Sequence, residues 1–344
     1  MDLSMNEEQE QLVQMLSVFF AKESSSERVR AAEPLGFDAA MWEKLAELGI
    51  SGLGVAAELG GGDAAFLDLA FVAEQAGRRL APVPIVETVV ASRLLAVLGG
   101  NATQVLDSII GAGRPACIAI NPAMHGVARL VPAGAIADVI VALDGNQLVS
   151  VPSVAPLEAP GNIACAPIAN RPLDEGTRLV HASDTAARVA HRHAVDEWKV
   201  LTGAALVGLA SAALELAVEY AKDRRQFGVP IGSFQTLAHR LADDATTVDG
   251  ARLLAYEAAW AADAEPARFS ELASMAFVFA TETARQVAAD CLHIHGGMGF
   301  SLEGDAQLFF RRATGWPQVL NGARDEYQLL ADLLFGETLH SKGA

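Results

Sequence analysis

Three short segments in the C-terminal half carry most of the chemical information in this sequence. The first, Asp223–Gly228 (DRRQFG), has an arginine pair at an expected helix end. The second, His293–Phe300 (HIHGGMGF), has adjacent glycines at an expected helix end, where backbone N–H groups can approach a ligand closely. The third is Phe310–Ala313 (FRRA). Each also has an ordinary reading, because arginines often cap helices and a glycine pair often only ends one.

The charge balance limits the classes of ligand. The chain has 344 residues, of which 25 are basic and 42 acidic, giving a net charge of −17. The acids are spread along the chain, so a nucleic-acid partner is not expected, because phosphate binding needs a concentrated basic surface. An anionic small molecule would have to be met by a local group of arginines or lysines.

The cysteines and the N-terminus indicate a reducing cytoplasm. Cys117, Cys165 and Cys291 lie far apart, so neither a disulfide framework nor a metal site is expected. The first residues lack the basic start and apolar run of a signal peptide. Val200–Leu214 is the most lipid-like stretch, but it meets Glu215 before reaching spanning length, which favours a buried helix and no membrane span.

Residues 1–112 are expected to form an N-terminal helical domain. A capping-box pattern at Ser4 and Glu7 precedes apolar residues at helical spacing up to Phe20. Further helices are expected at residues 39–48 and 87–98, and between Gly62 and Pro82. The glycine-rich segment 59–63 has two readings, a phosphate cradle or a turn between helices. The turn is favoured because no strand precedes it and no Lys-Ser/Thr follows.

The remaining chain divides into a reduced middle β-domain, residues 113–192, and a C-terminal helical bundle, residues 193–344. Val139–Leu143 and Leu148–Val151 flank a turn and are typical of paired strands. After residue 193, helical spacing predicts long helices near 196–225, 234–262, 270–293 and 324–335. The fold class is therefore mainly α with a small β-domain.

The order and separation of these elements resemble the acyl-CoA dehydrogenase family. The resemblance covers nearly the whole chain and is strongest from about residue 201 to 320, where Arg-x-x-Phe-Gly and Gly-Gly-x-Gly-Phe both occur. Leu45–Gly49 (LAELG) and Ala81–Pro84 (APVP) are also similar to the family. It implies a helical N-terminal domain, a middle β-domain and a C-terminal four-helix bundle that binds FAD.

The resemblance also implies roles for individual residues. Arg224 and Phe227 would contact the FAD of a neighbouring subunit, with Gln235 beside them. The backbone around His293, Gly296 and Gly297 would line the other wall of that site, although many relatives carry glutamine in place of His293. The implied reaction removes an α-proton and a β-hydride from an acyl-CoA to give the 2-enoyl-CoA. An electron-transfer flavoprotein then reoxidises the FAD.

The catalytic base of the family is expected to be missing. In many relatives it is a glutamate after the Arg-Arg-Ala-like stretch, where this chain has Asn321, and an amide cannot accept the proton. A minority of relatives place the base at the position of Trp198. Glu197 is adjacent, but a shift of one residue rotates a helical side chain by about 100°. Its other reading is a first-turn acid favoured by the helix dipole.

The middle domain departs from the family as well. Relatives usually carry a Thr-Glu-Pro-x-Ala-Gly-Ser-Asp-like segment that supports the flavin ring, whereas this chain has Ile118–His125 (IAINPAMH). The ring-binding half of the site is thus eroded, while the element that serves a neighbouring subunit's flavin is kept.

These departures favour a subunit that completes the flavin site of a related catalytic partner. Such α2β2 acyl-CoA dehydrogenases are known in the family, notably for bulky steroid side-chain CoA esters in actinobacteria, so fatty-acid or steroid side-chain β-oxidation is the implied context. Two alternatives stay open. One is a self-sufficient homo-oligomer with Glu197 or another acid as base, and the other is a non-enzymatic scaffold with the same fold.

Overall fold

Two compact units make up the chain in this computed structural model, which describes residues 5–152, 155–174, 177–320 and 323–340. One unit, the helical unit, combines residues 1–26, 70–81 and 200–344; the other, the sheet unit, combines 27–69 and 82–199. The division falls inside two helices, α4 (Phe66–Arg78) and α7 (Asp184–Asp223). Residues 1–112 therefore do not form a unit of their own, since their helices are shared between the two.

The sheet unit contains the expected β-structure. A four-stranded sheet has the order β1 (Ala116–Ile118), β3 (Val139–Asp144), β4 (Gln147–Pro152) and β6 (Leu179–Ser183). β1 is parallel to β3, and the other neighbours are antiparallel. β2 (Val127–Val131) and β5 (Ala169–Pro172) form a separate antiparallel pair. The strand–turn–strand predicted at residues 139–151 is confirmed as β3 and β4.

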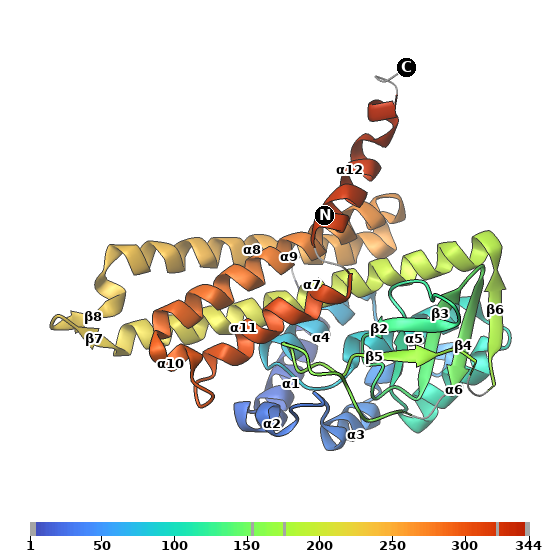
Figure 1. The fold of residues 1–344 in the computed structure, drawn as a ribbon, viewed down its shortest axis with the longest axis horizontal. Coiled ribbons are helices and arrows are strands. Elements are labelled where there is room, and N and C mark those ends of the chain that lie inside the picture. Colours follow the sequence, from blue (N-terminus) through green and yellow to red (C-terminus); the bar gives the residue numbers. More distant parts are fainter. Residues whose placement is uncertain (1–4, 153–154, 175–176, 321–322, 341–344) are drawn as a thin grey trace. The chain divides into compact units, whose positions relative to one another are not determined.

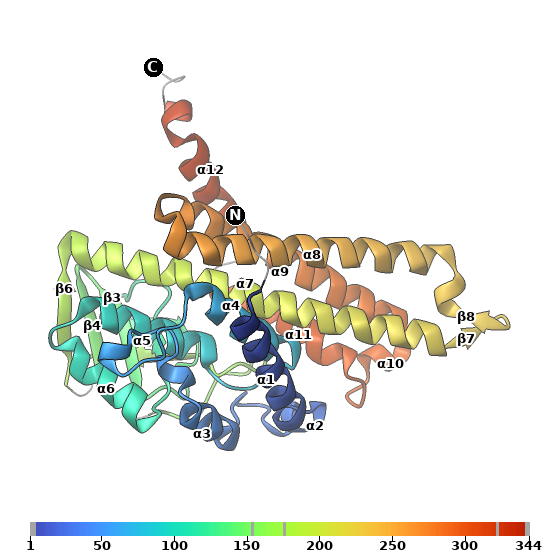
Figure 2. The ribbon, with the colours of Figure 1, turned by 180° about the vertical axis from the view of Figure 1, so that it is seen from behind.

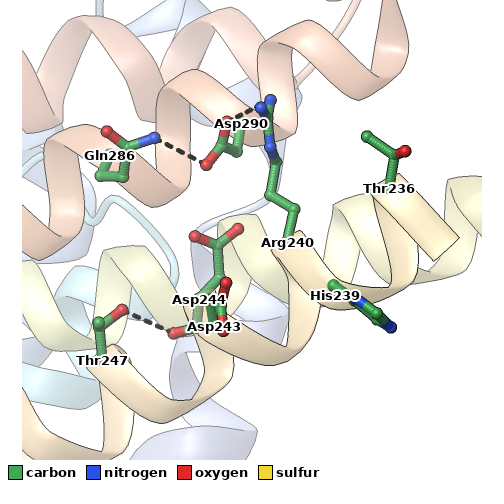
Figure 3. Close-up of a pocket in the computed structure, with 8 residues that line it drawn as sticks. All are labelled: Thr236, His239, Arg240, Asp243, Asp244, Thr247, Gln286 and Asp290. Atoms are coloured by element: carbon green, nitrogen blue, oxygen red, sulfur yellow. Dashed lines mark hydrogen bonds and ion pairs between the residues drawn. The ribbon is translucent and has the colours of Figure 1, made fainter.

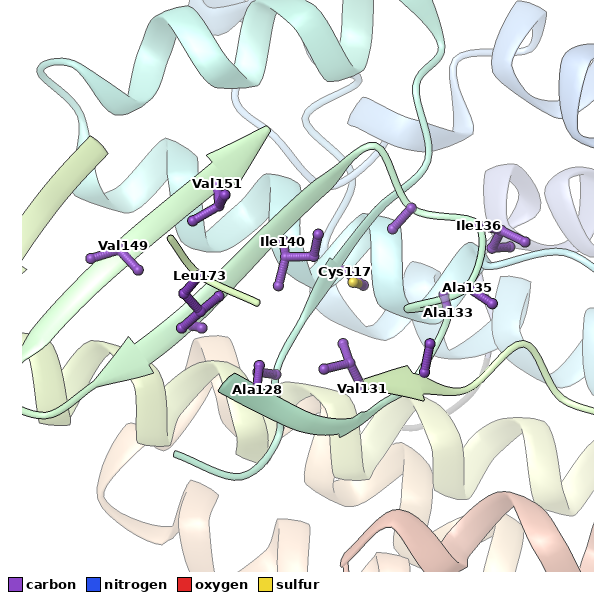
Figure 4. Close-up of a cluster of buried hydrophobic side chains, with 14 residues drawn as sticks. Cys117, Ala128, Val131, Ala133, Ala135, Ile136, Ile140, Val149, Val151 and Leu173 are labelled. Atoms are coloured by element: carbon purple, nitrogen blue, oxygen red, sulfur yellow. The ribbon is translucent and has the colours of Figure 1, made fainter. Parts of the chain in front are cut away.

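An apolar layer holds the strands together. Figure 4 shows Ile140 of β3 and Val149 of β4 pointing into the same space as Val131 of β2. All three side chains are fully buried, and their neighbours are mostly alanines, so the layer is thin and tightly filled. The helices of the sheet unit are α2 (Ser26–Ala31), α3 (Ala39–Glu47), α5 (Ile85–Leu98) and α6 (Ala102–Ala112), with short 3-10 turns at Ile50–Gly52 and Ala57–Leu59.

Long helices dominate the helical unit (Figures 1 and 2). Besides parts of α4 and α7, the helices of this unit are α1 (Glu7–Glu23), α8 (Gln235–Ala264), α9 (Pro266–His295), α10 (Gly297–Phe300), α11 (Ala306–Gly315) and α12 (Ala323–His340). Short 3-10 turns lie at Ile231–Ser233 and Trp316–Leu320. α9 packs against α8, α11 and α12. Alanines recur along its buried face, as at Ala276, Ala280 and Ala284, and these small side chains let the helices approach closely.

Two glycines bring α4 and α7 into backbone contact. A Cβ at Gly77 of α4 would lie 1.9 Å from the carbonyl oxygen of Ala205. A Cβ at Gly208 of α7 would lie 2.0 Å from the carbonyl oxygen of Glu74. Neither position tolerates any side chain while the two helices keep this separation.

The same crossing carries a buried polar network. The Glu74 carboxylate accepts hydrogen bonds from Arg252 Nε at 3.1 Å and Tyr256 Oη at 2.5 Å, both on α8. Arg252 Nη2 also donates to Ser211 Oγ of α7 at 2.7 Å. Phe71 packs edge-on against the Tyr256 ring. Because the buried carboxylate is fully paired, it links α4, α7 and α8 instead of destabilising them.

Several helix boundaries differ from the expectations. Asn6 caps α1 two residues later than predicted: its Oδ1 accepts a hydrogen bond from the Gln9 N–H, and its own N–H donates to Gln9 Oε1. Ser4 lies outside the described residues. α7 begins at Asp184, so the expected end of the middle domain at residue 192 lies inside a helix. α6 and α11 were not expected at all.

The glycine-rich segment 59–63 is a turn closed by its own backbone. The N–H of Gly61 donates to the carbonyl of Ala56, and the N–H of Gly62 donates to the carbonyl of Gly52. These donors are already used within the chain, so the structure favours the turn over the phosphate cradle.

α7 is long and apolar enough, by length and composition, to cross a membrane. However, 78% of its most apolar window is buried inside the protein. This burial is typical of a core helix, as the sequence indicated for residues 200–214.

We expect Gly208→Ala to lower the free energy of unfolding by about 2 kcal/mol or more, because the new methyl group would overlap the Glu74 carbonyl. Gly336→Ala on α12 is the matched control, since no atom lies within 4 Å of the point where its methyl group would stand. There the ordinary helix preference of alanine should add up to about 1 kcal/mol. Urea unfolding of both variants measures the difference, and equal effects would contradict the contact.

Candidate functional site

Arg224 and Phe227 lie on a short hairpin between α7 and α8. β7 (Arg225–Gln226) pairs with β8 (Val229–Pro230), and the N–H of Ile231 donates to the Arg224 carbonyl at 2.8 Å. The turn residues Phe227 and Gly228 have φ values of 54° and 84°. A tight two-residue hairpin turn of type I′ needs positive φ at both positions, and phenylalanine rarely adopts it. The hairpin thus presents an aromatic side chain where glycine or asparagine is usual.

The Phe227 ring is almost wholly in solvent. It is 92% exposed, and it touches Phe234 edge-on with the ring centroids 6.1 Å apart. Phe234 is the N-cap residue of α8 and supplies no side-chain hydrogen bond to the helix. An aromatic ring held this far out is typical of a surface that meets a ligand or another chain.

Arg224 and Gln235 offer polar groups beside this ring. Both are exposed, and within the described residues no hydrogen bond or ion pair holds the Arg224 guanidinium group. Gln235 is the first residue of α8, whose N-terminus lacks a side-chain cap. Free backbone N–H groups and the positive end of the helix dipole therefore lie next to the hairpin. This arrangement suits a phosphate group.

His293, Gly296 and Gly297 lie at the end of α9. All three are exposed, and Gly296 has φ 59° and ψ −135°, a conformation that other residues rarely adopt. A Cβ on either glycine would have no atom within 4 Å. Close packing within the chain therefore does not explain both glycines, and the backbone stays open to an approaching ligand.

A ring contact joins the two predicted elements. Tyr220 in the last turn of α7 stacks on His295 at the end of α9, with the ring centroids 4.3 Å apart. Figures 1 and 2 show the β7–β8 hairpin and α10 at the same end of the helical unit. The structure thus places at one end all the residues predicted to bind a cofactor: Arg224, Phe227, Gln235, His293, Gly296 and Gly297.

Exposed apolar side chains gather at that end. Besides Phe227, they include Met298, Phe300 and Leu302, which are 58%, 73% and 78% exposed. Large apolar side chains are seldom grouped on a free surface, so we expect a ligand or another chain to cover them.

Glu197 has a different setting, inside the sheet unit. Its carboxylate accepts hydrogen bonds from Arg93 Nε at 3.0 Å and Nη2 at 2.8 Å, and His193 Nε2 lies 3.5 Å away. Burial acts to raise the pKa of Glu197, but His193 and Arg93 outweigh it and the pKa is lowered. Because α7 begins at Asp184, Glu197 is not a first-turn acid, and the helix dipole does not account for it.

Glu87 is an acid that the sequence interpretation missed. It lies in the first turn of α5, and burial is the main cause that raises its pKa. Trp198 is itself buried and stands where the resemblance puts the second base position. The available signal was a lone acid inside the apolar run Ile85–Ala91 (IVETVVA).

Comparison with known proteins accounts for this arrangement. Residues 6–104 match the family described as acyl-CoA dehydrogenase, N-terminal domain, and residues 188–323 match acyl-CoA dehydrogenase, C-terminal domain. The chain is 33% identical over 336 residues to acyl-CoA dehydrogenase IpdE2 of Mycolicibacterium smegmatis, covering 96% of this chain and 100% of that one. The chain belongs to the acyl-CoA dehydrogenase family.

Solved structures of family members agree with the fold. A chain of the ChsE4–ChsE5 complex from Mycobacterium tuberculosis superposes with a TM-score of 0.85 at 25% identity, covering 97% of this chain and 99% of that one. A chain of the Tcur3481–Tcur3483 steroid ACAD gives a TM-score of 0.86 at the same identity and coverage. The predicted fold, mainly α with a small β-domain, is confirmed.

FAD is the cofactor of acyl-CoA dehydrogenases, and this chain's exposed groups fit part of it. The exposed Arg224 guanidinium and the open Gly296–Gly297 backbone suit its pyrophosphate. The segment expected to support the flavin ring fits less well. Ile118 and Ala119 are fully buried, and the Ala119 carbonyl is bound by His191.

Asn321, the residue expected in place of the family base, lies outside the described residues, so the missing base stays a prediction. Among the described residues, no group of three or more His, Cys, Asp or Glu side chains is arranged to hold a metal ion.

We expect Glu197→Gln to lower the free energy of unfolding by about 3 kcal/mol, because the buried carboxylate is the partner of Arg93. The lowered pKa of Glu197 makes its stabilisation present above the ordinary value of 4.5, and that stabilisation is lost as pH falls through the lowered value. The raised pKa of His193, caused chiefly by its hydrogen bond to Glu197, makes its stabilisation present below 6.5, to be lost as pH rises through the raised value. The loss in the variant should therefore be largest between about pH 5 and 6.5.

Urea unfolding of the wild type and Glu197→Gln from pH 3 to pH 9 measures this profile. A difference between the two proteins that stays constant over the whole range would contradict the three-residue contact.

Proposed function

We propose that this chain is a subunit of an FAD-dependent acyl-CoA dehydrogenase that completes the flavin site of a related catalytic subunit in an α2β2 assembly. The observation that carries the proposal is the projecting hairpin. It keeps an exposed Arg224 and a 92% exposed Phe227, although the usual base position reads Asn321. A subunit with this pattern is suited to bind a flavin at which another subunit carries out the catalysis.

The reaction is the α,β-dehydrogenation of an acyl-CoA thioester. A carboxylate takes the α-proton, the β-hydrogen leaves with its electron pair as hydride, and a 2-enoyl-CoA results. FAD supplies the hydride acceptor when bound. In this proposal the carboxylate comes from the partner, whereas this chain binds and orients the cofactor.

Each of the exposed groups predicted to bind FAD contributes to that binding. Arg224 donates to the pyrophosphate of the partner's FAD, and Gln235 with the open N-terminus of α8 adds neutral donors. Phe227 covers the dinucleotide and excludes water from it. On the same end, the backbone at His293, Gly296 and Gly297 lines the other wall of the site.

The comparisons support the wider setting of the proposal. ChsE4–ChsE5 is described as a complex, and Tcur3481–Tcur3483 is described as a steroid ACAD. We therefore propose a bulky acyl-CoA, such as a steroid side-chain ester, as the substrate. An electron-transfer flavoprotein as oxidant and a cytoplasmic location complete the proposal.

A self-sufficient enzyme is the second candidate. Glu197 is a poor base for it, because Arg93 occupies the carboxylate and the pKa is lowered. Glu87 is the acid that favours this candidate, since its pKa is raised and it lies beside Trp198. If the chain alone oxidises an acyl-CoA, turnover should survive Glu197→Gln and be lost in Glu87→Gln.

Co-expression with a related subunit that retains the catalytic carboxylate tests the main proposal. We expect little FAD on this chain purified alone and bound FAD on the complex, measured by absorbance at 450 nm per complex. Arg224→Ala should weaken FAD binding by the complex at least tenfold, since a charge-assisted contact to phosphate is lost. Arg285→Ala, which removes an exposed arginine on α9 ten residues before His295, is the control and should leave FAD binding unchanged.

Two results would refute the proposal. Stoichiometric FAD and full turnover by this chain alone would make it a self-sufficient enzyme. Absence of flavin both alone and with every related subunit would leave only the scaffold.

A further inference from the structure

A polar groove of about 400 Å³ lies between α8 and α9. It shares no residue with those assigned to FAD, although its first residue, Thr236, directly follows Gln235. Its lining is a stripe along α8 and two residues of α9 (Figure 3): Thr236, His239, Arg240, Asp243, Asp244, Thr247, Gln286 and Asp290. The stripe runs from Thr236 to Thr247, twelve residues, or about 16 Å of helix at 1.5 Å of rise per step. It is therefore long enough to lie along a helix of another chain.

One of its two buried carboxylates is fully paired. Asp290 Oδ1 accepts a hydrogen bond from Arg240 Nη1 at 3.0 Å, and Asp290 Oδ2 accepts one from Gln286 Nε2 at 2.8 Å (Figure 3). The guanidinium group that lines the groove is thereby committed to Asp290.

The other buried carboxylate, Asp244, has one oxygen without such a partner. Asp244 is only 5% exposed, and its Oδ2 atom is buried without a hydrogen-bond partner among the residues that the structure describes. Figure 3 shows its carboxylate directed from α8 into the groove, toward α9. A buried, unpaired acceptor costs stability, so its presence calls for a donor from outside this part of the chain.

The charges around Asp244 favour a cationic donor. The pKa of Asp244 is raised to about 7, first by burial and then by the charge of Asp290 and a hydrogen bond to it, against a smaller lowering by Arg240. Asp243 on α8 is the third carboxylate at this site, after Asp244 and Asp290. The other titratable groups facing the site are His239 on α8 and the Cys291 thiol on α9. Near neutral pH the groove thus carries an excess of negative charge around one unsatisfied oxygen.

We propose that this α8–α9 groove receives an arginine or lysine side chain of the related partner subunit, whose cationic head pairs with Asp244. A metal ion is a poorer occupant, because the described residues include no cluster of three or more ligands placed to hold one. A second copy of this chain is also a poorer occupant, because two surfaces from chains of net charge −17 repel each other. The inference rests on the proposed function only in requiring a partner subunit.

The test compares complexes of the related subunit with the wild-type chain, Asp244→Asn and Glu219→Gln. Glu219 is an exposed acid on α7, so its variant removes the same charge outside the groove. At pH 8 we expect Asp244→Asn to weaken the complex at least tenfold in Kd by isothermal titration calorimetry, whereas Glu219→Gln leaves it unchanged. Lowering the pH to 6 should weaken the wild-type complex about tenfold, since one proton must leave Asp244, but not the Asp244→Asn complex.

Thermal unfolding of the chain alone separates this effect from misfolding. The raised pKa of Asp244 means that the folded chain loses stability as pH rises from the ordinary value of 3.8 toward 7. Asp244→Asn lacks this loss, so its Tm at pH 8 should equal or exceed that of the wild type.

The outcomes distinguish this inference from the proposed function. Equal Kd values for all three chains overturn the inference and leave the proposed function standing. A wild-type chain that forms no complex with any related subunit overturns both. If Asp244→Asn instead abolishes self-association of the chain alone, the occupant is a second copy, and the assignment to a partner subunit is wrong.

Discussion

The Glu74 carboxylate is the contact on which the helical unit depends. It reaches from α4 to Arg252 and Tyr256 of α8, while Arg252 also binds Ser211 of α7. Without that pairing the buried charge of Glu74 would destabilise the folded chain. The close contact between α4 and α7 at Gly208 would then lose a stabilising interaction. The network fixes the course of α7 and α8 relative to each other. The hairpin that joins the far ends of these two helices is therefore set in place by residues far from it.

This division of labour suits the function proposed for the chain. The hairpin end carries exposed groups such as Arg224 and Phe227, whereas the crossing of α4 and α7 is closely packed. A rigid support of this kind lets Arg224 and Phe227 keep their positions before any cofactor or partner arrives, so less order has to be created on binding. Asp244 follows the same pattern on another face, since a fixed pair of helices holds its carboxylate ready for a donor from outside.

The sequence predicted the local features of the fold well and the long-range ones poorly. Amphipathic spacing identified α1, α8 and α9 to within a few residues, and the Arg-x-x-Phe-Gly and Gly-Gly elements were placed at helix ends, where the structure has them. The sequence predicts the start of α7 twelve residues too late. Half of residues 184–195 are polar, and these residues show no clear apolar face. The sequence could not indicate which residues pair with the buried acids, because the partners are far apart in the chain. Glu197 and Arg93 are separated by 104 positions, and Glu74 and Arg252 by 178.

The left-handed turn at Phe227 and Gly228 has a consequence for how cells must handle this chain. The exposed aromatic ring of Phe227 is displayed by every newly made copy of the chain, with Phe300 and Leu302 exposed at the same end. In general, chaperones and proteases recognise exposed apolar surfaces, and such surfaces favour aggregation. Synthesis together with the proposed partner subunit would cover these side chains soon after translation. Gene order and translational coupling would then affect the abundance of this protein as much as its folding stability does.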